Sequence, residues 1–317
     1  MKNRLQHVLC ALDAMERTAR MQSPLHRTDA RAKLLVTVVF LVTMLSVPPY
    51  RLPELLLFFV LLLAVQLIEG VLTGFAAAWW SGEALTLFGL YATLPATAVI
   101  LLFCRYARGR SPRQIVGSPG RAWEYAAFAP LGIGLFAAAV GICAAVGALR
   151  VEPEQNFAVG RWLLFLVGFL LQGASEEILC RGCLMGALLQ GQNPWVAVTV
   201  NSAAFALLHL FNPGVSPLAI CNTFLFGILM SLIVLRRGNL WGACAFHSLW
   251  NFAQGNLFGI RVSGLSAGPS PFLSFLSPDM PLWNGSQYGL EASLPVTLCL
   301  LLAVGAVRPR GVAPNPT

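Results

Sequence analysis

Three short motifs place ionisable or amide side chains inside long apolar stretches of the sequence. The motifs are Glu176, Glu177 and Arg181, then Phe205 and His209, and finally His247 and Asn251. An ionisable side chain near the centre of a bilayer costs at least about 2.5 kcal/mol on insertion scales, so one that persists inside a membrane span is a candidate for function. These motifs are therefore the candidates for chemistry.

A spacing of four residues puts two side chains on the same face of a helix. Glu177 and Arg181 have this spacing, so they can pair and stay charged in a low dielectric. Glu176 should point elsewhere and have no partner on its own helix. His247 and Asn251 also share a face, so both should project into one cavity.

Each motif also has a purely structural interpretation. The Glu177 and Arg181 pair could clamp two helices, the histidines could satisfy buried carbonyl groups, and Asn251 could join neighbouring helices. Together, however, an unpaired carboxylate, two neutral imidazoles and an amide can activate water and stabilise an oxyanion. Glu176 and His209 lie about 14 and 15 residues from the same ends of their helices, or roughly 21 Å, so they should converge.

The composition is that of a membrane protein. Of the 317 residues, 57% are hydrophobic and 11% are charged, whereas a soluble domain carries about 25% charged residues. The net charge of +8 does not indicate nucleic acid binding, because the basic residues stand in short blocks beside apolar runs, where they orient a chain in the bilayer. The 8 cysteines are spread through apolar segments, which excludes a disulfide-stapled secreted fold, and we expect them to be reduced.

The predicted fold class is all-α, a polytopic bundle of about eight or nine transmembrane helices. Candidate spans lie near 33–48, 54–80, 84–104, 122–149, 161–190, 194–211, 215–235, 239–259 and 292–307. We expect residues 1–110 to form an amino-terminal basic segment with accessory membrane helices, and residues 111–310 to form the domain that carries the motifs. The stretch 260–291 is rich in Gly, Ser and Pro and predicts a structured or re-entrant loop.

Lys and Arg in short loops predict which loops face the cytoplasm. From residue 105 onward they give a consistent pattern, with 105–121 and the pair Arg236 and Arg237 on the cytoplasmic side and the turns near 213 and 260 on the other. Before residue 105 the pattern is not consistent. Whether 33–48 spans the membrane, and on which side the amino terminus lies, therefore stay open.

The order EExxxR, FxxxH and HxxxN resembles the CPBP intramembrane proteases, whose type member is the type II CAAX prenyl endopeptidase. The likeness covers about residues 160–305 and includes FLFGILMSLIVLRRGNLWGACAFHSLWNF and the tail QGNLFGIRVSGL. Each motif is weak alone, but the order and spacing are specific. One departure is Cys180, which stands where the family usually carries an aromatic residue.

The resemblance implies a role for each motif residue. Glu176 and His209 would activate the attacking water, while His247 and Asn251 would stabilise the oxyanion of the tetrahedral intermediate.

The same resemblance implies supporting roles for Glu177, Arg181 and Phe205. Glu177 and Arg181 would hold their helix in register.

The residues leave the use of a metal open. Glu176, His209 and His247 form a legitimate set of zinc ligands, with water in the fourth position. The same side chains also serve a metal-free glutamate protease. No carboxylate behind either histidine is visible in the sequence, which favours the metal-free interpretation.

Four other residues are set aside. Cys180 and Cys183 form a CxxC inside an apolar segment, which indicates small packing residues rather than a redox or zinc pair. Glu69 marks a helix break or faces the cavity. Glu291 precedes the last apolar segment, where it favours the helix dipole, and we assign it no chemistry.

The leading hypothesis is an intramembrane endopeptidase of a bacterial-type cell membrane. It would hydrolyse a peptide bond of a protein or peptide substrate at or near the membrane surface, and whether that substrate is prenylated stays open. One alternative is a non-proteolytic binding or immunity protein of the same fold, against which the intact motifs argue. The second alternative is a transporter subunit, because residues 23–65 resemble the start of the energy-coupling subunit of vitamin and cobalt uptake transporters. Against it, no inverted repeat is present.

Overall fold

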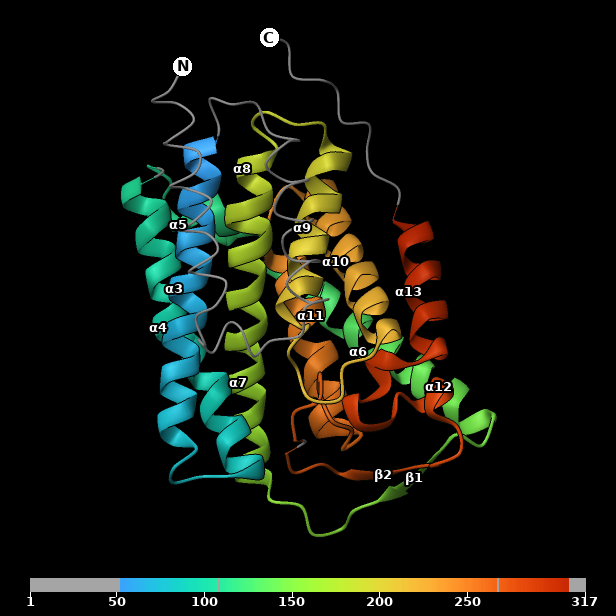
Figure 1. The fold of residues 1–317 in the computed structure, drawn as a ribbon. Coiled ribbons are helices and arrows are strands. Elements are labelled where there is room, and N and C mark those ends of the chain that lie inside the picture. The colour runs from blue at the N-terminus through green and yellow to red at the C-terminus, as the bar shows by residue number, and fades with distance from the viewer. Residues whose placement is uncertain (1–51, 108, 267, 308–317) are drawn as a thin grey trace, which may run out of the picture. The chain divides into compact units, whose positions relative to one another are not determined.

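The computed structural model describes residues 52–107, 109–266 and 268–307, and these residues form mainly helices (Figure 1). The long helices are α3 (Leu52–Ala76), α4 (Gly82–Ala107), α6 (Trp123–Ala145), α7 (Val159–Glu177), α9 (Pro194–Leu208), α10 (Pro217–Arg237), α11 (Trp241–Phe252) and α13 (Leu294–Ala306). The short helices are α5 (Pro112–Val116), α8 (Gly186–Leu188) and α12 (Pro281–Asn284), with 3-10 turns η3 (Pro119–Arg121), η6 (Ser286–Tyr288) and η7 (Leu290–Ala292). Two π-helical segments, η4 (Ile178–Met185) and η5 (Ala253–Leu257), extend α7 and α11.

The predicted all-α polytopic membrane fold is confirmed. Four of the described helices are long and apolar enough to cross a membrane, namely Gly82–Tyr106, Trp123–Ala145, Val159–Leu188 and Pro217–Arg237. Each candidate span from residue 54 onward coincides with a helix. The protein is therefore an integral, multi-pass membrane protein, and the number of crossings stays a prediction. The 33–48 segment, the basic amino-terminal block and most of 23–65 lie outside the described residues.

Proline and polar caps set the helix starts. Prolines occupy the first turn of α9, α10 and α13, where the missing N–H costs nothing. The side chains of Asn193, Ser216 and Ser293 accept hydrogen bonds from the first free backbone N–H groups. Helix α10 ends at Gly238, whose φ of 68° suits glycine.

The 260–291 region contains a strand as well as loops, which the sequence did not predict. Strands β1 (Leu149–Pro153) and β2 (Phe272–Leu276) pair antiparallel. The Asn284 side chain donates to the carbonyl oxygens of Ala148 and Ser277, at 3.0 and 2.7 Å. The region is therefore held against the end of α6 rather than free.

The expectation that all cysteines are reduced is wrong for one pair. Cys104 of α4 and Cys183 of η4 form a disulfide. Cys180, the other cysteine of the CxxC, is free and buried.

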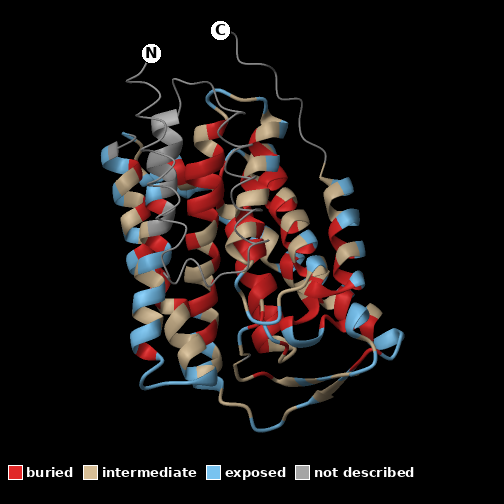
Figure 2. Ribbon diagram, in the orientation of Figure 1, coloured by how far each residue is buried: buried red, intermediate tan, exposed pale blue. Residues whose placement is uncertain are grey.

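Helix α11 lies at the centre of the packing, between α6, α7 and α10 (Figure 2). Every residue of it from Gly242 to Phe252 is buried. Glycines on the neighbouring helices permit this close approach: a Cβ at Gly132 of α6 would overlap the Phe246 carbonyl oxygen, and one at Gly173 of α7 would overlap the Ser248 side chain.

We expect Gly132→Ala to destabilise the protein by about 1–3 kcal/mol, because the added methyl group overpacks the contact between α6 and α11. Gly134→Ala, on the same helix, is the matched control, since a Cβ there has nothing within 4 Å. Thermal unfolding in detergent should separate the two variants. A Gly132→Ala midpoint equal to that of the control would contradict this packing.

Candidate active site

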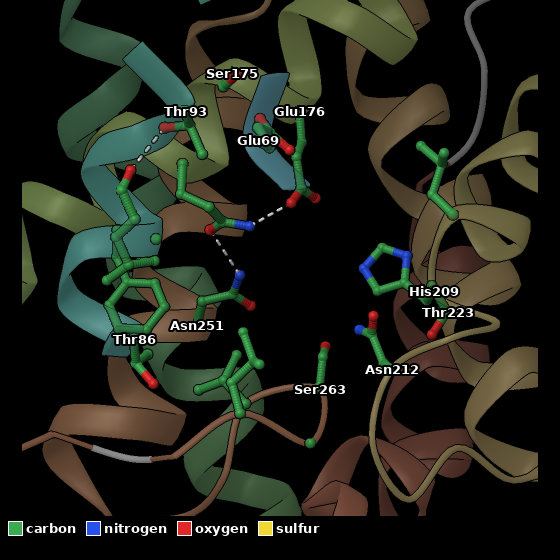
Figure 3. Close-up of a pocket in the computed structure, with 18 of the residues that line it drawn as sticks. Glu69, Thr86, Thr93, Ser175, Glu176, His209, Asn212, Thr223, Asn251 and Ser263 are labelled. Carbon is green, nitrogen blue, oxygen red and sulfur yellow. Dashed lines mark hydrogen bonds between the residues drawn. The ribbon is translucent and has the colours of Figure 1, made fainter. Parts of the chain in front are cut away.

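A cavity of about 800 Å³ lies among α3, α4, α7, α9, α10, α11 and the 262–266 loop. The four predicted catalytic side chains all line it: Glu176, His209, His247 and Asn251. Phe205 lines it too, whereas Glu177 and Arg181 lie outside its wall and are buried. In Figure 3, Glu176 and Asn251 lie on one side of the cavity and His209 on the other.

Glu177 and Arg181 form the ion pair expected from their spacing. Arg181 Nη1 donates to Glu177 Oε1 at 2.9 Å, and both side chains are fully buried. Arg181 Nη2 also donates to the Gly227 carbonyl oxygen of α10 at 3.1 Å, and its guanidinium lies 4.5 Å from the centroid of the Phe205 ring. The pair thus connects the α7–η4 segment to α9 and α10. That it holds its helix in register stays a prediction.

Glu177 also contacts His247. The Nδ1 atom of His247 lies 2.9 Å from Glu177 Oε1. Since that carboxylate is paired with Arg181, it accepts, and Nδ1 carries the hydrogen. No carboxylate behind either histidine is visible in the sequence, but in the structure Glu177 lies behind His247. The contact joins α7 to α11, a relation that spacing within one helix does not reveal.

Glu176 does have a partner on its own helix, contrary to expectation. Its Oε1 accepts a hydrogen bond from Gln172 Nε2 at 2.5 Å. Gln172 Oε1 in turn accepts from Asn251 Nδ2 at 3.1 Å, so this glutamine connects the carboxylate to the amide. The four-residue spacing of Gln172 and Glu176, which puts both side chains on one face of the helix, was the signal for this contact in the sequence.

The second carboxylate oxygen of Glu176 is the most distinctive atom of the site. Oε2 is buried and has no hydrogen-bond partner among the described residues. It lies 3.7 Å from His247 Nε2, while the side chain as a whole keeps 29% exposure. A basic oxygen that borders a cavity and lacks a donor can accept a proton from water.

His209 stands at the C-terminal cap of α9. Its Nδ1 lies 2.8 Å from the Phe205 carbonyl oxygen, and since a carbonyl only accepts, Nδ1 donates and Nε2 is left as an acceptor. The ring packs 4.8 Å from the Phe205 ring.

The candidate zinc ligands are not gathered. In the part of the chain that the structure describes, no three His, Cys, Asp or Glu side chains are close enough to hold a metal ion. Glu176, His209 and His247 as placed therefore do not fit a metal.

Two further carboxylates line the cavity. Glu69 of α3 lies beside Glu176 (Figure 3), which agrees with one of the two alternatives for it. Glu291 of η7 is fixed by the Ser263 N–H and hydroxyl, at 2.6 and 2.9 Å from Oε2, and burial raises its pKa above the ordinary value. The sequence shows that Glu291 precedes the last apolar segment, but not that it contacts Ser263 or lines the cavity.

Comparison with known proteins agrees with the motifs. Residues 158–253 match the family described as type II CAAX prenyl endopeptidase Rce1-like. The matched range contains all seven motif residues. No curated protein matches the chain. The predicted resemblance to the CPBP proteases is thus confirmed over residues 158–253.

We expect Glu177→Gln to lower thermal stability, because it leaves the buried Arg181 charge unpaired, at a cost of about 3–5 kcal/mol. Glu152→Gln is the matched control: it removes a carboxylate that lies 3.1 Å from Arg150 on the surface, which should cost about 0–1 kcal/mol. The measurement compares the thermal unfolding midpoints of the two variants in the same detergent. Equal midpoints for the two variants would contradict a structural role for Glu177.

Proposed function

Taking the Rce1-like domain as the premise, we propose that this protein is an intramembrane endopeptidase in which Glu176 and His209 activate the attacking water. The observation that supports this most directly is Glu176 Oε2, which is buried and without a hydrogen-bond donor in a cavity that His209 also lines. A peptide is the substrate, and the scheme does not require a prenyl group.

In the first step, the water oxygen attacks the carbonyl carbon of the scissile peptide bond. The water proton passes to Glu176 Oε2, and the carbonyl π electrons move onto the oxygen. His209 orients the water through its free Nε2. General base catalysis of this kind contributes about 10²–10⁴-fold to the rate.

Asn251 and His247 stabilise the oxyanion. Asn251 Nδ2 gives one hydrogen to Gln172, which leaves the other for the oxyanion. His247 donates from Nε2 in the form of the ring in which both nitrogens carry hydrogen, and Nδ1 then donates to Glu177. The intermediate then collapses: the C–N bond breaks, and Glu176 returns its proton to the leaving nitrogen.

We expect Glu176→Gln to reduce proteolysis by at least about 10²-fold while the protein stays inserted and folded, because only the base is removed. Glu69→Gln, which changes another carboxylate of the same cavity, should keep most of the activity. The measurement compares membrane-protein termini by mass spectrometry in cells that carry each variant. Unchanged termini on loss of Glu176 would favour a binding or immunity protein, and loss of expression would indicate a structural role.

The scheme uses no metal. The metal-free scheme is supported by the placement of the candidate ligands, since no three His, Cys, Asp or Glu side chains of the described residues are close enough to hold a metal ion. A missing carboxylate behind the histidines does not support it, because Glu177 contacts His247 as carboxylates contact zinc-bound histidines.

We expect purified protein to keep its activity in the presence of strong chelators, with substoichiometric zinc by elemental analysis. The control is the same preparation after zinc is added back. Stoichiometric zinc that is lost and regained together with activity would overturn the metal-free scheme.

A further inference from the structure

Along α3 and α4, the cavity occupies only one half of the helical layer. Its α3 residues run from Val65 to Ala77, in the C-terminal half of that helix and the turn after it, and its α4 residues run from Gly82 to Thr93, in the N-terminal half. Because α3 and α4 are antiparallel neighbours joined by a short turn, both sets lie toward the same end (Figure 1).

The other walls lie toward this end too. Helix α9 contributes its last residues and the turn after them, from Phe205 to Pro213, and α10 contributes its early residues, from Asn222 to Phe226. The 262–266 loop adds to the wall there. The exposed lining residues mark the mouth of the cavity: Gln66, Gly70, Gly74, Ala77, Gly82, Pro213 and Leu265.

The opposite end is closed by packing and ion pairs. Glu124 at the start of α6 is fully buried and accepts from Arg121 Nε at 2.6 Å and Arg237 Nε at 2.8 Å. The Asn239 amide also donates to it, at 3.2 Å. Among the described residues, none from α5, α6 or α8 lines the cavity.

Charge differs sharply between the two ends. The closed end carries six described arginines, at the C-terminal ends of α4 and α10 and in the segment that joins α4 to α6: Arg105, Arg110, Arg113, Arg121, Arg236 and Arg237. Around the mouth end, at the starts of α4 and α7, in and after β1 and in the loops after η5 and β2, acidic and basic residues are mixed: Glu83, Glu152, Glu154 and Asp279 with Arg150, Arg161 and Arg261. Loops rich in Lys and Arg face the cytoplasm, so the closed end is the cytoplasmic end.

The mouth lies at the depth of a membrane interface. Phe75 and Trp79, beside it on α3 and the following turn, are 74% and 76% exposed, and aromatic residues gather at the interface between the bilayer and water. A polypeptide that emerges from the outer leaflet can therefore enter the cavity without crossing the bilayer.

From these observations we propose that the cavity takes its substrate from the non-cytoplasmic side. The substrate class is then the extracytoplasmic juxtamembrane segment of a membrane-anchored polypeptide, rather than a prenylated tail in the cytosol. The orientation stands on charge and geometry alone, whereas the substrate class rests on the proposed function.

Orientation is tested by cysteine labelling in full-length protein with Cys10 and Cys221 replaced by serine. Ala77→Cys lies at the mouth, and Gly120→Cys, where a Cβ meets only the Ser118 hydroxyl at 3.8 Å, lies at the closed end. A membrane-impermeant maleimide should label Ala77→Cys in intact spheroplasts and Gly120→Cys only after lysis. The parent without either cysteine is the control. The reverse pattern, or equal labelling of both before lysis, would overturn the orientation.

The substrate class is tested by mapping new termini that disappear in the Glu176→Gln strain. We expect them in extracytoplasmic segments within about one helical turn of a membrane span. Termini in cytoplasmic segments would overturn the substrate class. If no terminus depends on Glu176, the proposed proteolysis fails and the substrate class with it, whereas the labelling result still decides the orientation.

Discussion

The structure depends on the need to keep two opposite charges paired inside an apolar protein. Glu177 and Arg181 are fully buried, and losing either partner would leave an uncompensated charge in a low dielectric. The pair also binds to its surroundings, because Arg181 reaches the Gly227 carbonyl oxygen and Glu177 reaches His247. The ion pair that satisfies the charges thereby sets α7 against α10 and α11. Since π-helical turns are frequent at functional sites, the change from α to π hydrogen bonding at Ile178, directly after Glu177, fits this position.

Hydrogen bonds from α7 position the polar side chains that line the cavity. Glu177 orients His247, and Gln172 connects Glu176 to Asn251. Glu176, His247 and Asn251 therefore share one support that spans α7 and α11, and close contacts at Gly132 and Gly173 keep α11 in place. His209 is supported separately, through Phe205 on α9. One wall of the site, on α7 and α11, is therefore held by its own hydrogen bonds. The other wall, with His209, is positioned by α9.

The family match covers residues 158–253, yet much of the cavity wall lies outside it. Helices α3 and α4 precede the match, and the 262–266 loop and Glu291 follow it. The side chains proposed for catalysis thus lie inside the matched range, whereas part of the mouth lies outside it, on α3 and α4 and in the 262–266 loop.

The sequence by itself determined the membrane class, the helical segments from residue 54 onward and the Glu177–Arg181 pair. Composition sets the solvent that a chain requires, and side chains four residues apart on a helix meet whatever the tertiary structure is. The tertiary structure decided the contact of Glu177 with His247, the bridge from Gln172 to Asn251, the β1–β2 pairing and the Cys104–Cys183 disulfide. It also placed His209 across the cavity from Glu176. These relations depend on how far each helix slides and rotates against its neighbours, and local spacing along one helix carries no information about that movement.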